Sequence, residues 1–324
     1  MAVINGTIFD DSLEGTAVGD SLFGFGGDDF LNGLYDAVTL YGGDGSDYLV
    51  GSHGDAGTGV SRFYGGEGDD DFGTGSGNDL FYGGDGNDFF TVSAGQDSIY
   101  GGDGSDVLNL FFYNKAVNFT LGNGGSGTVT IKAAANLGFT GVTNYFGLEG
   151  LAGGNFDDTL RGNTGNNELI GNGGADSLFG GGGADALFGG SGHDTLTGGK
   201  GRDAFAFEGQ EDRHKLAADA DVITDFDPAQ DRLVFFSRNF TGLNNTADDA
   251  GGLMGETQIF NLDPAEFVVQ TNRYAASTAV RVIYDSDDGL LYYDADGALS
   301  GYRPKLIADI GKDLHLTASD IFIW

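Results

Sequence analysis

Cysteine is absent from the 324-residue sequence, and proline occurs only three times. Without cysteine the chain can form neither a disulfide framework nor a thiolate metal site. Basic side chains are also scarce: 15 lysines and arginines stand against 49 acidic residues, which gives a formal charge of -34. A chain this acidic repels nucleic acid and anionic membranes, so we expect it to bind neither. No apolar run reaches the roughly 18 residues that a membrane-spanning helix needs.

Glycine, in contrast, is abundant, with 61 residues against a usual share of about 7 %. Because glycine loses the most backbone entropy on folding, an ordinary helix-rich core is not expected. Of these glycines, 52 lie in residues 1–207 and nine in 208–324. Glycine-rich acidic sequence is typical of disorder. The 26 phenylalanines and 13 tyrosines, together with a regular spacing of glycine and aspartate, argue against disorder here.

Glycine and aspartate recur with a period of nine residues. The pattern is G-G-x-G-x-D-x-U-x, where U is a large apolar residue, and it is clear in residues 83–91 and 101–109. Counting in nines gives a first array of eleven units over residues 6–109 and a second array of six units over residues 153–206. This is the nonapeptide pattern of RTX (hemolysin-type calcium-binding) secreted proteins, and the chain resembles that family.

Each nine-residue unit predicts one turn and one strand. The last three residues suit a very short strand with U pointing to one side, and the glycines of the first six permit the positive φ angles of a tight turn. Two units then form one coil of a parallel β-roll, a flattened solenoid in which each coil contacts only its neighbours. We therefore expect an all-β fold with two β-roll arrays and a β-rich C-terminal domain.

Units on the same edge of such a roll are 18 residues apart, so their sixth-place aspartates stack on one another. One Gly-Asp turn is explained by turn formation alone, but stacked carboxylates repel each other unless a cation lies between them. With the turn carbonyls they offer about six to eight hard oxygens, the ligand set of Ca²⁺. The predicted Ca²⁺ ligands are Asp11, Asp20, Asp29, Asp47, Asp70, Asp79, Asp88, Asp97, Asp106, Asp158, Asp176, Asp185, Asp194 and Asp203.

One ion per stacked pair corresponds to roughly ten to a dozen Ca²⁺, whose binding should drive folding. The register also predicts weak positions. Asp20 faces a valine across the coil, and Asn167 replaces an aspartate in the second array. Asp47 faces Asp70 only if five extra residues in the unit 51–64 loop out, and that unit has no clear sixth-place residue. Terminal coils lack an outer partner, so we expect them to bind more weakly.

The sequence divides into four segments: a first roll at 1–109, a β-rich interruption at 110–152, a second roll at 153–207 and a C-terminal domain at 208–324. The last segment contains T-D-F-D, I-Y-D…G-L-L-Y-Y-D-A-D-G and L-T-A-S-D-I-F-I. In this order the motifs resemble the C-terminal secretion domain of serralysin-type proteases. The chain starts without a Sec-type signal peptide and ends on one acidic and four apolar residues. The resemblance implies an extracellular protein that a type I ABC exporter secretes through its C-terminus.

No catalytic constellation is found, because the four histidines are scattered and neither H-E-x-x-H nor G-x-S-x-G occurs. We therefore expect a protein without enzymatic activity that acts in an extracellular matrix, on a surface or in host interaction. Two alternatives stay open. The chain could be the calcium-binding accessory module of a secreted epimerase, protease or lipase, although Met1 leads almost directly into the first repeat, which favours a whole protein. It could also be a pore-forming or signalling RTX protein, a class that the lack of a long apolar helix disfavours.

Overall fold

The computed structural model describes the chain except for residues 36, 52–58, 74–76, 93–95, 112–114, 126, 133–139, 208–219, 237–239, 241–242, 244, 251–258, 272–276, 278, 296 and 298–303. It divides into two compact units. The first comprises Met1–Asn114 and Phe119–Ala152, and the second comprises Lys115–Asn118 and Gly153–Trp324. The predicted all-β class is confirmed, since the described elements are strands and two short 3₁₀ helices, η2 (Pro264–Glu266) and η3 (Ala318–Asp320).

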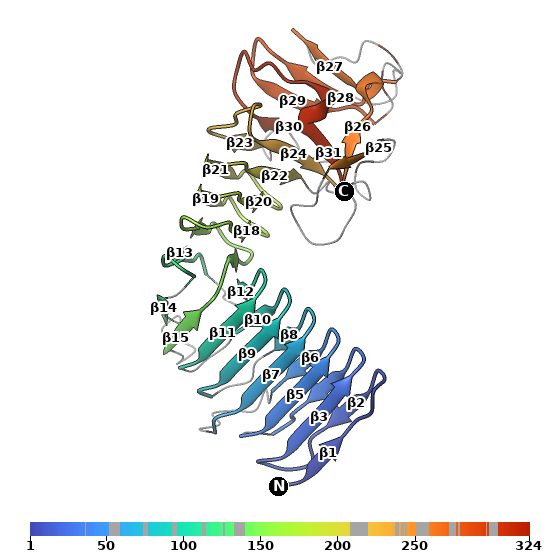
Figure 1. The fold of residues 1–324 in the computed structure, drawn as a ribbon. Coiled ribbons are helices and arrows are strands. Elements are labelled where there is room, and N and C mark those ends of the chain that lie inside the picture. Colours follow the sequence, from blue (N-terminus) through green and yellow to red (C-terminus); the bar gives the residue numbers. More distant parts are fainter. Residues whose placement is uncertain are drawn as a thin grey trace. The chain divides into compact units, whose positions relative to one another are not determined.

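The first unit consists of two sheets that the chain visits alternately, so that successive coils stack on one another (Figure 1). Strands within each array pair in parallel, whereas β14 pairs antiparallel with β15. The order of the first sheet is β1 (Val3–Asn5), β3 (Ser21–Gly26), β5 (Thr39–Asp44), β7 (Arg62–Glu67), β9 (Leu80–Asp85), β11 (Ser98–Asp103), β15 (Thr140–Phe146) and β14 (Gly127–Lys132). The order of the second sheet is β2 (Ser12–Glu14), β4 (Phe30–Asn32), β6 (Tyr48–Val50), β8 (Asp71–Gly73), β10 (Phe89–Thr91), β12 (Val107–Asn109) and β16 (Gly150–Ala152).

The eighth-place side chains fill the interior between these two sheets. Phe63 and Phe81 stack with 4.7 Å between ring centroids, and neither ring is exposed. Each fully buried side chain of this size stabilises the fold by about 1.5–3 kcal/mol. Phe63 pairs in register with Leu40 and Phe81. It is therefore the eighth residue of the irregular unit 51–64, and Ser61 is the sixth.

The second unit continues the same construction from Gly153 onward. One of its sheets has the order β17 (Thr159–Arg161), β19 (Ser177–Gly182), β21 (Thr195–Lys200), β23 (Asp221–Ile223), β30 (Lys305–Asp309), β29 (Leu290–Tyr293), β28 (Val282–Asp285) and β27 (Phe267–Gln270). The other has the order β18 (Glu168–Ile170), β20 (Ala186–Phe188), β22 (Ala204–Phe207), β24 (Arg232–Phe235), β31 (Ile321–Ile323), β26 (Ile259–Leu262) and β25 (Asn245–Ala250). The remaining strand, β13, spans Asn118–Thr120.

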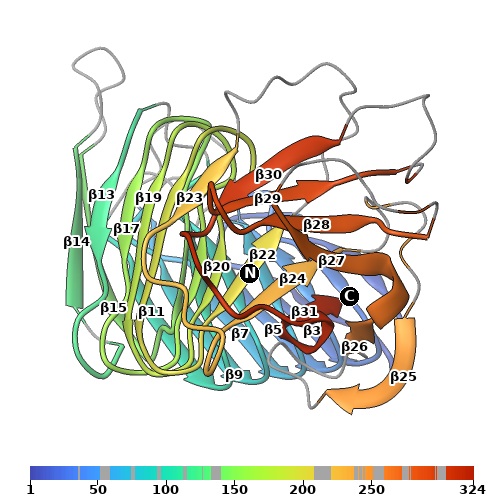
Figure 2. The same ribbon diagram turned by 90° about the horizontal axis from the view of Figure 1, so that it is seen from above.

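The first two strands after residue 207 extend the second roll. Strand β23 pairs in parallel with β21, and β24 pairs in parallel with β22. The chain then leaves the roll, and β28, β29 and β30 lie side by side as an antiparallel group (Figure 2). The last strand, β31, returns to pair with β24. Among the described residues, no helix has the length and apolar character needed to cross a membrane.

Candidate metal centres

The sixth-place aspartates form ladders along the edges of the rolls. In most of them the backbone N–H donates to Oδ1 of the aspartate in the next coil, as that of Asp70 does to Asp88 at 2.9 Å. Asp47 donates in the same way to Asp70 at 2.9 Å although they are 23 residues apart, so the ladder stays in register across the unit 51–64, of which residues 52–58 lie outside the described residues. The other bonded pairs are Asp11–Asp29, Asp29–Asp47, Asp79–Asp97, Asp88–Asp106, Asp158–Asp176, Asp176–Asp194 and Asp185–Asp203.

One kind of turn leaves the second carboxylate oxygen of its aspartate without a hydrogen bond. In these open turns the second and fourth residues have positive φ angles, as Gly84 (128°) and Gly86 (131°) do in the turn that ends at Asp88. The Oδ2 atom of the aspartate is buried and accepts no hydrogen bond. The open turns end at Asp29, Asp47, Asp70, Asp88, Asp106, Asp176, Asp185 and Asp194.

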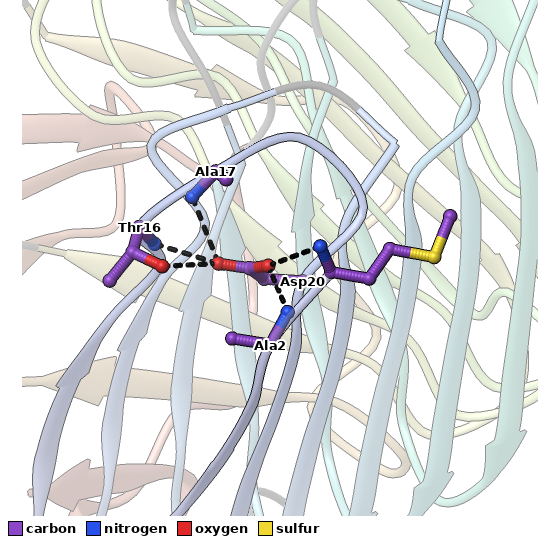
Figure 3. A network of polar contacts seen from close by, with 5 residues as sticks. Ala2, Thr16, Ala17 and Asp20 are labelled. Atoms are coloured by element: carbon purple, nitrogen blue, oxygen red, sulfur yellow. Dashed lines mark hydrogen bonds and ion pairs between the residues drawn. The ribbon is translucent and has the colours of Figure 1, made fainter.

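A second kind of turn satisfies the carboxylate within its own unit. In these capped turns neither the second nor the fourth residue has a positive φ, and the second-place N–H donates to the sixth-place side chain. Asp20 is the most completely bonded example: it accepts from the backbone of Thr16, Ala17 and Ala2 and lies 3.6 Å from the N-terminal amine (Figure 3). The capped turns end at Asp11, Asp20, Asp158 and Asn167.

The two kinds of turn occur in a definite order. The four capped turns are the first two units of each array, and the open turns follow them. Asp203 ends a turn with the positive φ angles of the open kind, at Gly199 and Gly201. Asp79 and Asp97 belong to turns that lie partly outside the described residues. Thirteen of the fourteen predicted ligands therefore bond to another aspartate in a ladder, and Asp20 is the exception, so the predicted ligands do not share one environment.

The first glycine of an open turn keeps space clear beside the unpartnered oxygen. A Cβ atom added at Gly83 would overlap Asp88 Oδ2 and the carbonyl oxygen of Gly101 in the next coil. The same relation holds at Gly65, between Asp70 Oδ2 and the Gly83 carbonyl. Two oxygens, one from the same turn and one from the next coil, therefore lie beside the first glycine. Any other residue would place its Cβ atom between them.

Burial makes the open-turn carboxylates hard to ionise in the metal-free chain. Desolvation is the main cause, and for Asp70 the charges of Asp88 and Asp47 add to it. At Asp20, by contrast, the hydrogen bond from the Ala2 backbone does most to hold the pKa well below its usual range. Burial raises the pKa to about 8 for Asp70, to about 7 for Asp106, Asp176 and Asp185, and to about 6 for Asp47 and Asp88.

The residues present fit a hard divalent cation. Eight buried carboxylate oxygens of the open turns have no hydrogen-bond donor, and a buried charge without a partner is strongly unfavourable. Among the described residues no three His, Asp or Glu side chains are grouped so that they could hold a metal ion. An ion would therefore take most of its ligands from turn carbonyls, and Ca²⁺ accepts carbonyl and carboxylate oxygens in flexible geometry. Mg²⁺ demands stricter octahedral geometry and keeps more water.

One edge of the first roll is interrupted, as the sequence predicted. Val38 is fully buried in the sixth place of its unit, and its neighbour Thr39 donates its N–H to the Asp20 carbonyl. Ser61 occupies the sixth place of the following coil and donates its N–H to Asp79 Oδ1 at 2.9 Å. Two successive coils on this edge therefore offer no carboxylate.

Residues outside the repeats continue the ladders at their far ends, which the sequence analysis missed. Asp106 donates its N–H to Glu149 Oε2 at 3.1 Å, Asp194 to Asp221 Oδ1 at 3.1 Å, and Asp203 to Asp231 Oδ1 at 3.0 Å. The expectation that terminal coils lack an outer partner is therefore wrong at these three positions. A signal was available: Asp221 and Asp231 each begin a D-x-U triplet, but their spacings break the count of nine.

The period of nine also matches a known family model. The model is described as the RTX calcium-binding nonapeptide repeat, and together its matches cover residues 5–110 and 152–213, just over half of the chain. A search of curated proteins finds no match. The seven matched segments are residues 5–34, 23–55, 53–81, 82–110, 152–187, 170–205 and 179–213.

Proposed function

Because the chain belongs to the family of RTX calcium-binding nonapeptide repeat proteins, we propose that it is a secreted protein whose two rolls fold when Ca²⁺ fills their open turns. One observation carries the proposal. In the open turns eight aspartate oxygens are buried without a hydrogen-bond donor, and beside Gly83 the Asp88 oxygen lies next to a carbonyl oxygen of the following coil.

Calcium supplies what these turns lack. In the metal-free chain, folding either buries an unpaired carboxylate or forces it to hold a proton, and both cost free energy. A cation bound between the carboxylate and the carbonyls removes that cost, and because the site exists only in the folded chain, its binding energy is folding energy. The rolls therefore form where Ca²⁺ is plentiful, as it is outside cells.

The proposal assigns fewer ions to the rolls than a count of their aspartates would, because only one of the two kinds of turn leaves a carboxylate oxygen unbonded. Each open turn with an unpartnered oxygen takes one ion, which gives eight among the described turns. The capped turns need none, because their own N–H groups satisfy the carboxylate. Eight Ca²⁺ would neutralise about half of the formal charge of -34. The folded protein then keeps a net negative charge, and this charge makes its molecules repel one another.

The role outside the cell is non-enzymatic in this proposal. The buried acids of the rolls are engaged in the ladders, and the family resemblance of the C-terminal segment supplies a route of export through a type I ABC exporter. A structural or surface role in an extracellular matrix or in host contact suits a stiff, acidic, calcium-dependent roll. The extracellular matrix of exporting cells that carry the gene is compared with that of cells that lack it. In the cells that carry it, the share of the protein held in the matrix is measured against the share in the medium.

The calcium proposal is tested on the full chain by following folding directly. In chelator we expect weak β-sheet circular dichroism, which rises on addition of Ca²⁺ but not of equimolar Mg²⁺. The single tryptophan, Trp324, stacks on Phe236 with 4.9 Å between ring centroids, so its fluorescence reports folding of the C-terminal part in the same titration. A spectrum that is unchanged by chelator contradicts the proposal.

A further inference from the structure

Residues 147–149 form a shortened version of the repeat turn. Strand β15 pairs with β11 so that Phe146 lies beside Tyr100, and β16 pairs with β12 so that Gly150 lies beside Val107. Glu149 therefore takes the sixth place of a further coil, 43 residues after Asp106. Only Gly147 and Leu148 separate it from Phe146, whereas five residues separate Tyr100 from Asp106.

The contacts of this turn reproduce those of a regular open turn. Asp88 donates its N–H to Asp106 Oδ1 at 3.0 Å, and Asp106 in turn donates its N–H to Glu149 Oε2 at 3.1 Å. A Cβ atom added at Gly101 would overlap Asp106 Oδ2 and the carbonyl oxygen of Gly147. Gly147 thus stands where the first glycine of the next repeat would stand. Asp106 itself has no exposed surface, and its Oδ2 has no hydrogen-bond donor.

We propose that Glu149 and the Gly147 carbonyl complete a Ca²⁺ site with Asp106, so that the interruption between the two arrays closes the ion ladder of the first unit. These two ligands lie outside the residues that the family model matches. Glu149 Oε2 accepts the Asp106 N–H as an aspartate Oδ1 does in a regular coil. This inference rests on the proposed function, since it assigns one further ligand pair to the same kind of site.

A purely structural role for Glu149 predicts a different effect of substituting it. If its carboxylate served only as an acceptor for the Asp106 N–H, an amide oxygen would replace it without loss. The ion, in contrast, needs the negative charge, because Ca²⁺ affinity depends on the number of charged ligands. Glu149→Gln separates the two roles, because glutamine keeps an acceptor oxygen in the same place and removes only the charge.

The test counts bound Ca²⁺ on the full chain by calorimetric titration and by metal analysis after dialysis. For Glu149→Gln we expect one site to weaken by about tenfold or more, with one ion fewer retained at limiting Ca²⁺. The control is Glu14→Gln, which makes the same change at an exposed position of strand β2, outside the open turns of the same unit, and it should bind as the unmodified chain does. Equal binding by Glu149→Gln and the unmodified chain, or equal losses in both variants, overturns the inference.

Two further outcomes are separable. If the unmodified chain takes up no Ca²⁺, the proposed function fails together with this inference, whereas calcium uptake that Glu149→Gln leaves unchanged defeats only the inference. If Glu149→Gln does not regain β-sheet circular dichroism at saturating Ca²⁺, Glu149→Asp decides the question. It keeps the charge on a shorter side chain, so we expect the full number of ions with one weakened site, and loss of that ion altogether contradicts the inference.

Discussion

Asp88 and Asp106 lie one coil apart, and the backbone N–H of Asp88 donates to Oδ1 of Asp106 at 3.0 Å while Oδ2 of both residues is buried without a donor. One oxygen of each carboxylate therefore fixes the register between coils, and the other is left for a cation. The same side chain therefore serves both the stacking of coils and the proposed metal binding. The unbonded oxygen also separates the open turns from the capped ones, whose second oxygen already has donors.

The first prediction contrasts an open turn with a capped one. Asp88→Asn keeps an acceptor for the Asp70 N–H and removes the charge, so we expect about a tenfold or greater loss of affinity at the neighbouring calcium sites. Asp20→Asn makes the same change where Thr16, Ala17 and Ala2 already bind the carboxylate, so calcium affinity should change little. Calorimetric titration of both variants measures the difference. Equal losses would show that the two kinds of turn do not differ in metal binding.

The second prediction concerns the space beside the open-turn carboxylate. Gly83→Ala places a Cβ atom against Asp88 Oδ2 and the Gly101 carbonyl, and such overpacking costs about 1–3 kcal/mol. We expect a lower thermal midpoint in Ca²⁺ and fewer ions bound. Gly26→Ala is the matched control, because its added Cβ meets no atom closer than 3.7 Å and its φ is not positive. A control that loses as many ions as Gly83→Ala contradicts the role assigned to the first glycine.

The third prediction is a pH dependence of the metal-free chain. Burial raises the pKa of Asp70 to about 8, of Asp106 to about 7 and of Asp47 to about 6 in the folded state, against about 3.9 in an unfolded chain. Between these values the folded state binds more protons than the unfolded one, so the stability of the metal-free fold is largest below about pH 4 and falls as pH rises from there to about 8.

In chelator we therefore expect more β-sheet circular dichroism at pH 5 than at pH 8, and Ca²⁺ at pH 8 should restore it. Sedimentation at each pH serves as the control, because a chain with a sequence pI of about 4.1 can associate as its charge falls. A metal-free chain that is equally folded, or less folded, at pH 5 would show that these carboxylates do not limit folding.

The repeat made the roll predictable from the sequence. Because glycine, aspartate and the apolar eighth residue recur in register, the sequence predicted the strands, the buried layer of residues such as Phe81 and Phe90, and the 18-residue stacking that places Asp70 on Asp88. It also predicted the break at Val38. These features depend only on the period of the repeat, so they can be predicted from the sequence without knowing which distant residues are in contact.

Features that depend on the backbone conformation of single turns could not be predicted in this way. Phe25 and Asn172 adopt positive φ angles (82° and 70°) in open turns, where the sequence alone favours glycine. Gly154, conversely, holds the second place of a capped turn without a positive φ. Glu149 was missed for another reason, since its place in the ladder is set by strand pairing across a non-repeating segment of the chain. The predicted boundaries after residues 109 and 207 stay predictions.

The last prediction concerns the C-terminal residues. Strand β31 pairs with β24, Ile321 has no exposed surface, and Trp324 stacks on Phe236. Removal of residues 320–324 therefore deletes an internal strand of the second unit's sheet, between β24 and β26, as well as the proposed export signal. Expression beside a type I exporter should leave the truncated chain inside the cell. Calcium titration of the purified truncated chain should still show the sites of the first unit, because the ladder bonds of that unit, such as Asp70 to Asp88 and Asp88 to Asp106, join its own residues. Export that continues after truncation would remove the secretion proposal, while loss of all calcium binding would show that the first roll cannot fold without an intact C-terminus.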